Sequence, residues 1–323
     1  MRNQIKDTFC PMLWKAVFID QMGRVFACCH SRPTVIGNIH EQNLQDIYNS
    51  ETMRNFRQKS LNNELQCFAW CSLLKQECFN VCTRLQKHDL LRLENPLIAD
   101  FNELVFLMLN YGNACNVRCI MCRQNHENEK SIDYERLIKN VDKIPFKIIY
   151  IQGGEPLFLE GAKKFFNYAV SKNMKPCFLT NGMLIDEEWA KKIVLYSPAV
   201  FISINAATKK MHELVNRGSE WETVISNIQK IRNVREKYQT DIKIVGHMTI
   251  IIENLDEISL FISKFNQLGF DSINFGYDKR VPLYLKTHFL KKMGLRRRVK
   301  KAIEVSEVKS MIDMCRLRLL ELA

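Results

Sequence analysis

The stretch Cys115-Asn-Val-Arg-Cys119-Ile-Met-Cys122 decides how the rest of this 323-residue chain is interpreted, because it places three thiols at offsets of four and three. Thiols at this spacing can converge on one face of a short loop. Cysteine thiolates are the usual ligands of iron–sulfur clusters, and a cuboidal four-iron cluster has one iron at each of four corners. The three thiols therefore favour a cluster with one iron left free to bind a small chelating molecule.

The residues before this cysteine loop (residues 115–122) are predicted to form a buried strand. Residues 103–109 read Glu-Leu-Val-Phe-Leu-Met-Leu, a β-type run, and residues 111–113 supply the turn that follows it. A second β-type run over residues 147–152 ends in Gly153-Gly154-Glu155-Pro156. Each motif therefore follows the C-terminal end of a predicted strand.

The order of these two motifs resembles the radical S-adenosylmethionine (radical SAM) superfamily, whose signature is a Cys-x3-Cys-x2-Cys loop after the first barrel strand. Gly153-Gly154-Glu155-Pro156 resembles the family's Gly-Gly-Glu motif, which contacts the amino group of the methionine moiety. The resemblance implies that Cys115, Cys119 and Cys122 hold a [4Fe-4S] cluster whose open iron binds S-adenosylmethionine. It further implies that an electron from a donor such as flavodoxin or ferredoxin cleaves this cofactor. The products would be methionine and a 5'-deoxyadenosyl radical that abstracts hydrogen from the substrate.

A zinc site is the alternative for the same loop, because cysteine spacings of two and three residues also suit zinc. Zinc requires a fourth ligand, and His126 could supply it. A zinc site would not explain the Gly-Gly-Glu motif after the next strand, which is the context that supports a motif assignment. The cluster is therefore the favoured interpretation.

The composition is that of a globular protein, with 46% hydrophobic and 25% charged residues. No apolar run approaches the roughly 18 residues that a membrane span requires, and residues 1–7 lack the hydrophobic core of a signal peptide. A cytoplasmic protein without a membrane partner is expected. The 12 cysteines then favour metal–thiolate chemistry over disulfides. Cys177, inside an apolar run, is predicted to be a small buried hydrophobe.

The N-terminal third contains seven of the 12 cysteines. Two β-type runs, at residues 16–19 and 24–27, flank Gly23 and predict a hairpin with Cys10 and Cys28 near its open end. Helical segments are expected at residues 43–48 and 50–59. Four further thiols follow: Cys67, Cys71, Cys78 and Cys82.

This cysteine-rich region resembles the SPASM or twitch domain, which carries auxiliary iron–sulfur clusters in many radical SAM enzymes. The matching residues are Cys10, Gly23, Cys28, Ile36-Gly37-Asn38-Ile39, Tyr48-Asn49-Ser50 and the late cysteine quartet. The resemblance implies one or two auxiliary clusters, with ligands among Cys10, Cys28, Cys67 and Cys71 and further candidates Cys29, Cys78 and Cys82. Three features depart from the usual pattern: the domain precedes the barrel, the quartet's first two gaps are each one residue wider, and the usual seventh cysteine is absent unless Cys29 substitutes for it. Zinc bound by four cysteines is the alternative here.

Beyond residue 100 the sequence alternates strand-like and helix-like segments, which is typical of parallel β/α units. Strands are predicted at residues 103–109, 147–152, 176–180, 199–204, 242–251 and 272–276. Helices are predicted at residues 132–143, 159–172, 186–196, 220–238 and 256–268. The prediction is an α/β protein, a partial (β/α)6 TIM-like barrel preceded by a small cysteine-rich α+β metal-binding domain. The expected domains are residues 1–95, the barrel at 100–280 and a basic helical segment at 281–323.

The active site of a β/α barrel forms at the C-terminal ends of its strands. Asn181 follows the third strand, where a cofactor contact and a plain Asn-Gly turn are equally favoured. Strand alternation predicts that Ser203 and Asn205 point the same way, and the family resemblance implies that they contact the cofactor's ribose. Arg217 resembles an arginine that pairs with the cofactor carboxylate, although a solvated arginine fits as well. One of His247 and Met248 is expected to point into the barrel.

Net charge is +12, and residues 286–323 concentrate it with 11 Lys or Arg against four Asp or Glu. This segment can attract an acidic partner or form one solvated helix face. Nucleic acid is less favoured, because aromatic residues do not interleave with the cations. SPASM-bearing relatives often crosslink, oxidise or epimerise peptides, so a peptide or protein is the first substrate expected. The alternatives are dehydrogenation or rearrangement of a sugar, alcohol or nucleotide, and a non-catalytic electron carrier or metal-stapled binding protein.

Overall fold

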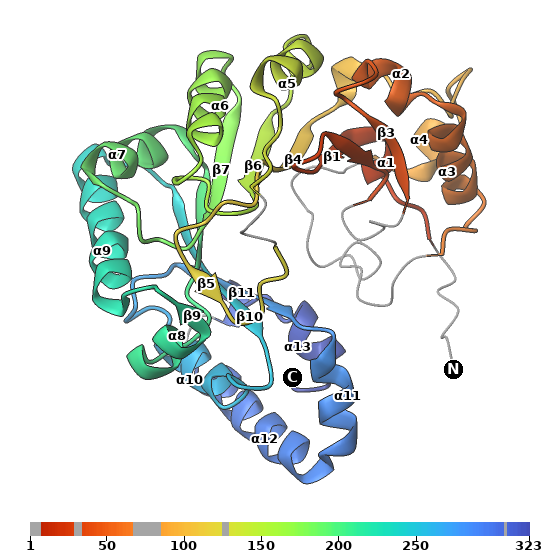
Figure 1. The fold of residues 1–323 in the computed structure, drawn as a ribbon. Coiled ribbons are helices and arrows are strands. Elements are labelled where there is room, and N and C mark those ends of the chain that lie inside the picture. Colours follow the sequence, from red (N-terminus) through yellow and green to blue (C-terminus); the bar gives the residue numbers. More distant parts are fainter. Residues whose placement is uncertain (1–7, 29–33, 67–84, 125–128, 307–308) are drawn as a thin grey trace. The chain divides into compact units, whose positions relative to one another are not determined.

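The computed structural model describes residues 8–28, 34–66, 85–124, 129–306 and 309–323. The chain divides into two compact units, each assembled from several segments (Figure 1). The first unit comprises residues 1–114, 127–154 and 159–176. The second unit comprises residues 115–126, 155–158 and 177–323.

The first unit is built on a sheet with the strand order β6-β4-β1-β2-β3. The strands are β1 (Ala16–Ile19), β2 (Arg24–Phe26), β3 (Val35–Asn38), β4 (Phe106–Asn110) and β6 (Ile148–Gln152). β1, β4 and β6 pair in parallel, whereas β2 pairs antiparallel with β1 and β3. The β1–β2 turn contains Gly23 at φ +74°, a left-handed conformation that glycine adopts without steric cost. The predicted hairpin is thus confirmed.

Six helices surround this sheet in the described part of the first unit. They are α1 (Met12–Lys15), α2 (Leu44–Tyr48), α3 (Glu51–Leu61), α4 (Lys87–Leu90), α5 (Tyr134–Val141) and α6 (Glu160–Ser171). The side-chain oxygens of Asn43 and Ser50 accept backbone N–H bonds at the starts of α2 and α3, which satisfies donors that a helix leaves unpaired. α6 packs against β6, and α2 contacts α5 (Figure 1).

Arg57 of α3 is fully buried and connects separate segments of the first unit. Its guanidinium donates hydrogen bonds of 2.9 Å to the backbone carbonyls of Leu13, Tyr48 and Leu97. A fourth bond of 2.9 Å reaches the side-chain oxygen of Asn49. The guanidinium also lies 4.8 Å from the centre of the Tyr48 ring, a favourable cation–π geometry. One cation therefore joins α1, the α2–α3 junction and residue 97.

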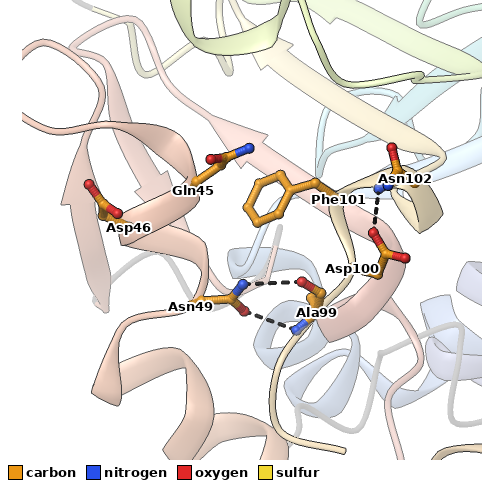
Figure 2. A pocket seen from close by; sticks show the side chains of 7 residues that line it. All are labelled: Gln45, Asp46, Asn49, Ala99, Asp100, Phe101 and Asn102. Atoms are coloured by element: carbon orange, nitrogen blue, oxygen red, sulfur yellow. Dashed lines mark hydrogen bonds between the residues drawn. The ribbon is translucent and has the colours of Figure 1, made fainter. Parts of the chain in front are cut away.

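Asn49 extends this connection to Ala99. Its amide nitrogen donates to the Ala99 carbonyl at 3.1 Å, and its amide oxygen accepts from the Ala99 N–H at 2.9 Å. Figure 2 shows this two-way pairing beside an open hollow lined by Gln45, Asp46, Asn49, Ala99, Asp100, Phe101 and Asn102. Asn49 and Arg57 thus hold residues 97–99 against the start of α3.

The second unit contains a parallel sheet with the order β11-β10-β8-β7. β7 (Lys175–Thr180) begins in the first unit and ends in the second, and the others are β8 (Ala199–Ser203), β10 (Lys243–Ile250) and β11 (Ser272–Tyr277). A separate antiparallel pair joins β5 (Arg118–Cys119) to β9 (Asn216–Arg217). The helices are α7 (Glu187–Tyr196), α8 (Lys209–Val215), α9 (Trp221–Tyr238), α10 (Glu257–Lys264), α11 (Arg280–Thr287), α12 (Phe289–Val305) and α13 (Cys315–Leu319). α7 packs along α9, and α10 along α12 (Figure 1).

All six predicted strands and all five predicted helices of residues 100–280 are present. The alternation of parallel strands with helices confirms the predicted α/β class. The helix predicted at residues 256–268 is α10, which ends at Lys264, and among the strands the largest difference is at β4, which begins at Phe106 rather than at residue 103. Residues 101–103 instead form a 3-10 turn, because the Asp100 carboxylate caps the Asn102 N–H at 2.9 Å. In the described parts of the chain, no helix is long and apolar enough to cross a membrane.

Candidate functional site

The cysteine loop is anchored by backbone pairing within the second unit. Cys119 lies opposite Asn216 in the β5–β9 pair. The N–H of Ile120 donates to the Val215 carbonyl at 2.9 Å, and the N–H of Cys122 donates to the Cys119 carbonyl at 3.0 Å. The loop that carries the three thiols is therefore fixed by a partner almost 100 residues further along the chain.

The three thiols lie close enough to influence one another electrostatically. Burial raises the pKa of Cys119 to about 12, and Cys115 and Cys122 add to the rise. Burial also raises the pKa of Cys115, whereas hydrogen bonding to the backbone of Val117 lowers it. Cys115 and Cys119 are partly buried, and Cys122 is exposed. Thiolates that repel each other's negative charge are stabilised by a cationic metal core, and three sulfur donors leave one corner of a four-iron cluster open. The donor set thus fits an iron–sulfur cluster.

A single-ion site has a different requirement, since zinc needs about four ligands around one point. Among the described residues, no three His, Cys, Asp or Glu side chains converge closely enough to hold one metal ion. His126, the proposed fourth zinc ligand, lies outside the described residues.

Asn181 is the predicted site residue that the structure brings to the thiols. Its amide nitrogen donates to the side-chain oxygen of Asn116 at 2.8 Å and lies 3.8 Å from the sulfur of Cys115. Its amide oxygen accepts from the N–H of Met183 at 2.9 Å, and Gly182 has φ +81°. Both interpretations of the Asn-Gly pair are therefore compatible with the structure, because the turn residue also contacts the cysteine loop.

Glu155 is buried, with 1% of its surface exposed, and its carboxylate is occupied by protein donors. One oxygen accepts from the hydroxyl of Thr180 at 2.7 Å and from the N–H of Leu157 at 3.1 Å. The other accepts from the N–H of Asn181 at 2.7 Å. Burial raises the pKa of this carboxyl, and the three hydrogen bonds act in the opposite direction. Glu155 therefore positions the end of β7 and, through it, Asn181.

Gly153 and Gly154 occupy left-handed conformations with φ +89° and +58°. A Cβ atom on Gly154 would lie 2.1 Å from the carbonyl oxygen of Ala114, and one on Gly153 would lie 2.8 Å from that of Gly112. Side chains are thus excluded at both positions by the backbone that leads into the cysteine loop. Pro156, which completes the motif, is buried.

The expectation that Ser203 and Asn205 alternate along one strand is wrong, because β8 ends at Ser203 and Asn205 has φ +56°. The Asn205 side chain is buried, donates to the side-chain oxygen of Asn216 at 2.8 Å and accepts from the N–H of Thr249 at 2.7 Å. Ser203 remains partly exposed at the strand end. Arg217 is exposed on β9, opposite Arg118 of the cysteine loop.

Sequence analysis missed the buried polar network behind this strand end. The Nδ1 atom of His212 lies 2.5 Å from the carbonyl oxygen of Ile204, and its Nε2 atom lies 2.9 Å from the hydroxyl oxygen of Ser219. Burial lowers its pKa. Asn254 donates to the carbonyls of Asn205 and Thr249, both at 2.9 Å. The burial of these polar side chains, which the sequence does not reveal, was the missing signal.

A second link fixes the far end of the cysteine loop. Arg123, directly after Cys122, donates to the Asp278 carboxylate at 2.9 Å, and Arg280 donates to the other oxygen at 2.8 Å. Burial would raise the pKa of Asp278, but the hydrogen bonds from Arg280 and Arg123 outweigh it and hold the value at about 2. Asp278 thus ties the loop to the end of β11.

Of the predicted auxiliary ligands, the structure describes Cys10 and Cys28, both partly exposed. Cys10 packs against the apolar cluster that contains Phe18 and Phe26, and Cys28 lines a small hollow with the same two phenylalanines. Both thiols therefore border the apolar patch around Phe18 and Phe26, and their role as ligands of one metal centre stays a prediction. The other candidates lie outside the described residues: Cys29, Cys67, Cys71, Cys78 and Cys82.

Cys177 is 1% exposed, which confirms the prediction of a buried hydrophobe.

Comparison with known families defines the class. The family model of the radical SAM superfamily matches residues 109–265, and that of the SPASM iron–sulfur cluster-binding domain matches residues 10–78. The chain therefore carries a radical SAM domain and, before it, a SPASM-type iron–sulfur cluster-binding domain. Both resemblances seen in the sequence are confirmed, and the two domains imply [4Fe-4S] clusters and S-adenosylmethionine binding.

Individual relatives match over shorter regions. The Fe-coproporphyrin III synthase of Methanosarcina barkeri is 33% identical over 90 residues, which are 26% of this chain and 23% of that protein. The S-adenosylmethionine-dependent nucleotide dehydratase RSAD2 of Siniperca chuatsi is 24% identical over 156 residues, 46% of this chain and 44% of that protein. The chain thus spans less than half the length of these relatives. Streptococcus suis SuiB bound to its precursor peptide SuiA has a TM-score of 0.46 at 14% identity, covering 83% of this chain and 63% of that one.

Proposed function

We propose that this enzyme reductively cleaves S-adenosylmethionine and abstracts a hydrogen atom from a peptide or protein. The observation that carries the proposal is the cysteine loop, whose three thiols interact with one another and are fixed by β9 and Asn181. A [4Fe-4S] cluster would be held by Cys115, Cys119 and Cys122, and when bound it would supply the electron for this cleavage. An external donor such as flavodoxin or ferredoxin replenishes that electron.

The other residues of the site position the cofactor. We assign the backbone turn at Gly153 and Gly154 to its amino group, because no side chain can occupy these positions. Ser203, partly exposed at the end of β8, is the proposed ribose contact, and the exposed Arg217 is the proposed partner of the carboxylate. Asn205 supports this strand end from within, since both ends of its amide are bonded to protein.

Two features support a peptide substrate. The SPASM-type domain, with one or two auxiliary clusters, occurs in relatives that modify peptides. The solvent face of α12 combines apolar Phe289, Leu290 and Met293 with the cations Arg297, Lys300 and Lys301, and Leu290 is 84% exposed. An acidic peptide with apolar side chains would complement this surface in charge and in hydrophobicity.

The second candidate substrate is a nucleotide. RSAD2 is named as a nucleotide dehydratase, and it matches almost half of this chain. The cations of α12 would then attract the phosphates, whereas its exposed apolar residues would have no role in binding.

The first experiment tests cofactor cleavage. The protein is reconstituted anaerobically, iron and sulfide are counted per chain, and 5'-deoxyadenosine is measured after adding reductant and S-adenosylmethionine. About eight or twelve irons with cleavage indicates one or two auxiliary clusters besides the radical cluster, and about four indicates none. Intact clusters without cleavage would favour the electron-carrier alternative, and zinc alone would contradict the proposal.

The second experiment separates the two substrate classes. A library of acidic peptides should raise 5'-deoxyadenosine above the uncoupled background, whereas a mixture of nucleoside triphosphates should not. Replacing Arg297, Lys300 and Lys301 together with Glu should remove the peptide effect. The matched control replaces three exposed lysines of the first unit, Lys139, Lys143 and Lys164, with Glu and should leave the effect unchanged. Stimulation by nucleotides alone would favour the second candidate.

A further inference from the structure

The sheet of the second unit has two unlike faces. On the face that α10 covers, Met248 and Phe275 are buried, and Gly246 packs directly against ring atoms of Phe261 and Phe270. The intervening residues point to the opposite face, where the apolar Phe201 and the buried Val245 lie toward the N-terminal ends of the strands. The other residues of this face are small or polar and partly exposed: Ser203, His247, Thr249, Ser272, Asn274 and Gly276. The prediction that one of His247 and Met248 points away from the helices is thereby resolved in favour of His247. A polar, partly exposed face on a parallel sheet is unusual, because both faces of such sheets are normally covered by apolar packing.

His247 stands at the centre of a polar row across three strands. The strand register places it beside Ser203 of β8 and beside Asn274 of β11. Its Nδ1 lies 2.6 Å from the Asn274 side-chain oxygen, and its Nε2 lies 3.3 Å from the Thr249 hydroxyl. With the amide in this orientation, Nδ1 carries the proton and Nε2 is an acceptor.

Burial of this imidazole disfavours its charged form, and a glycine leaves space beside one of its nitrogens. Burial lowers the pKa of His247, Asn274 and Asp313 act in the opposite direction, and Arg316 adds to the lowering. A Cβ atom on Gly276 would lie 3.5 Å from Cε1 and Nε2, so the glycine leaves space beside the acceptor nitrogen. The amide nitrogen of Asn274 has no hydrogen-bond partner among the described residues. One donor, Asn274 Nδ2, and one weakly bonded acceptor, His247 Nε2, therefore lie on this partly exposed face of the sheet.

We propose that Asn274, His247 and Thr249 form a substrate subsite that binds an uncharged polar group, an amide or a hydroxyl. The subsite rests on the proposed function, because it assigns the chemistry of the substrate part that lies on this face of the sheet. An amide presents one donor and one acceptor, which match His247 Nε2 and Asn274 Nδ2. None of the three side chains carries a charge that would offset the desolvation of a phosphate or carboxylate.

The test is nuclear magnetic resonance of the reconstituted enzyme with 15N-labelled histidine and oxidised clusters. N-methylacetamide and glycerol serve as amide and hydroxyl probes, with acetate and inorganic phosphate as charged probes. The Nε2 resonance of His247 should shift saturably with at least one uncharged probe and with neither charged probe. His212 and His288 provide internal controls, because both ring nitrogens of His212 are hydrogen-bonded and His288 is exposed. Their resonances should not shift saturably with any probe.

Two variants make the assignment specific. Asn274→Ala should weaken the binding of the amide probe about tenfold, the effect of losing one hydrogen bond. Met248→Leu, a change on the opposite face of the same strand, should leave it unchanged. Absence of a saturable shift with both uncharged probes, or saturation by phosphate or acetate, would overturn the subsite. Formation of 5'-deoxyadenosine, measured on the same preparation, tests the proposed function separately, because the titration requires no turnover.

Discussion

The cysteine loop of the second unit and the described cysteines of the first unit are held in different ways. The loop is fixed by hydrogen bonds: β5 pairs with β9, Asn181 reaches Cys115 and Asn116, and the buried Glu155 fixes Asn181. Cys10 and Cys28 border the apolar patch of a hairpin, and the backbone N–H of Cys10 also donates to the Ser60 hydroxyl at 2.8 Å. Directional bonds determine where an atom lies, whereas apolar packing mainly determines whether the unit is folded.

Because of this difference, we expect substitutions in the two units to have different effects on activity and on stability. Substitutions in the polar network of the second unit should affect activity more than stability. Substitution of Arg57 in the first unit should act on stability, because its guanidinium joins several described segments of that unit. The predictions below test this separation, beginning with the largest effect.

Replacing Cys115, Cys119 and Cys122 together with Ala should abolish 5'-deoxyadenosine formation while part of the iron remains bound in the first unit. The reason is that three thiolates are the only protein ligands that the loop offers to the radical cluster. The measurement is chromatography of the reaction products together with iron counts. Cys177→Ala, a change at a buried thiol outside the loop, should retain cleavage. Undiminished cleavage by the triple variant would show that these three cysteines do not hold the cluster that cleaves the cofactor.

Arg57→Met should destabilise the first unit by about 3–5 kcal/mol, because several buried acceptors lose a charged donor at once. Three backbone carbonyls lose the donor described here, whereas the Asn49 oxygen keeps the Ala99 N–H. Anaerobic urea unfolding measures the loss. The exposed Arg54 lies on the same helix, and Arg54→Met should change stability by less than about 0.5 kcal/mol. Equal losses of unfolding free energy in the two variants would show that the Arg57 hydrogen bonds do not hold these segments together.

The sequence predicted the elements of the fold well because their signals are local. The hairpin around Gly23 and the six strands beyond residue 100 follow from β-type runs that end in turn residues. The order of the cysteine and Gly-Gly-Glu motifs identified the family. Long-range contacts were not predictable in this way, since neither the pairing of Cys119 with Asn216 nor the link from Arg123 to Asp278 leaves a local pattern.

Asn205 shows a second limit of prediction from the sequence. Strand alternation assumes a continuous strand, but the left-handed backbone at Asn205 ends it after Ser203. Asparagine tolerates this conformation better than most residues do, because its short polar side chain can bond locally. The sequence correctly predicted a strand end near Asn205. The direction of its side chain, which bonds to Asn216 and Thr249, depends on the backbone conformation and could not be predicted.

Glu155→Gln should cost about 1–3 kcal/mol and reduce cofactor cleavage, a smaller effect on stability than that of Arg57. The new amide nitrogen must face a donor, either the Thr180 hydroxyl or the Asn181 N–H, because both carboxylate oxygens accept bonds. Urea unfolding and 5'-deoxyadenosine formation measure the two effects. The exposed Glu160→Gln is the matched control. Full activity in Glu155→Gln would show that Asn181 does not depend on this carboxylate.

The smallest predicted effect is the pH dependence of stability that arises from His212. Burial lowers the pKa of His212 in the folded chain, although Ile204 and Glu213 oppose the change, so the unfolded chain binds a proton more readily below a pH of about 6.5. Stability should therefore fall as pH decreases from 7.5 to 5.5, by at most about 1.4 kcal/mol per pH unit for this group. Urea midpoints at three pH values measure the slope, and His212→Gln should reduce it. An unchanged slope would mean that His212 accepts a proton without unfolding. The polar network behind β8 would then be looser than its two short hydrogen bonds indicate.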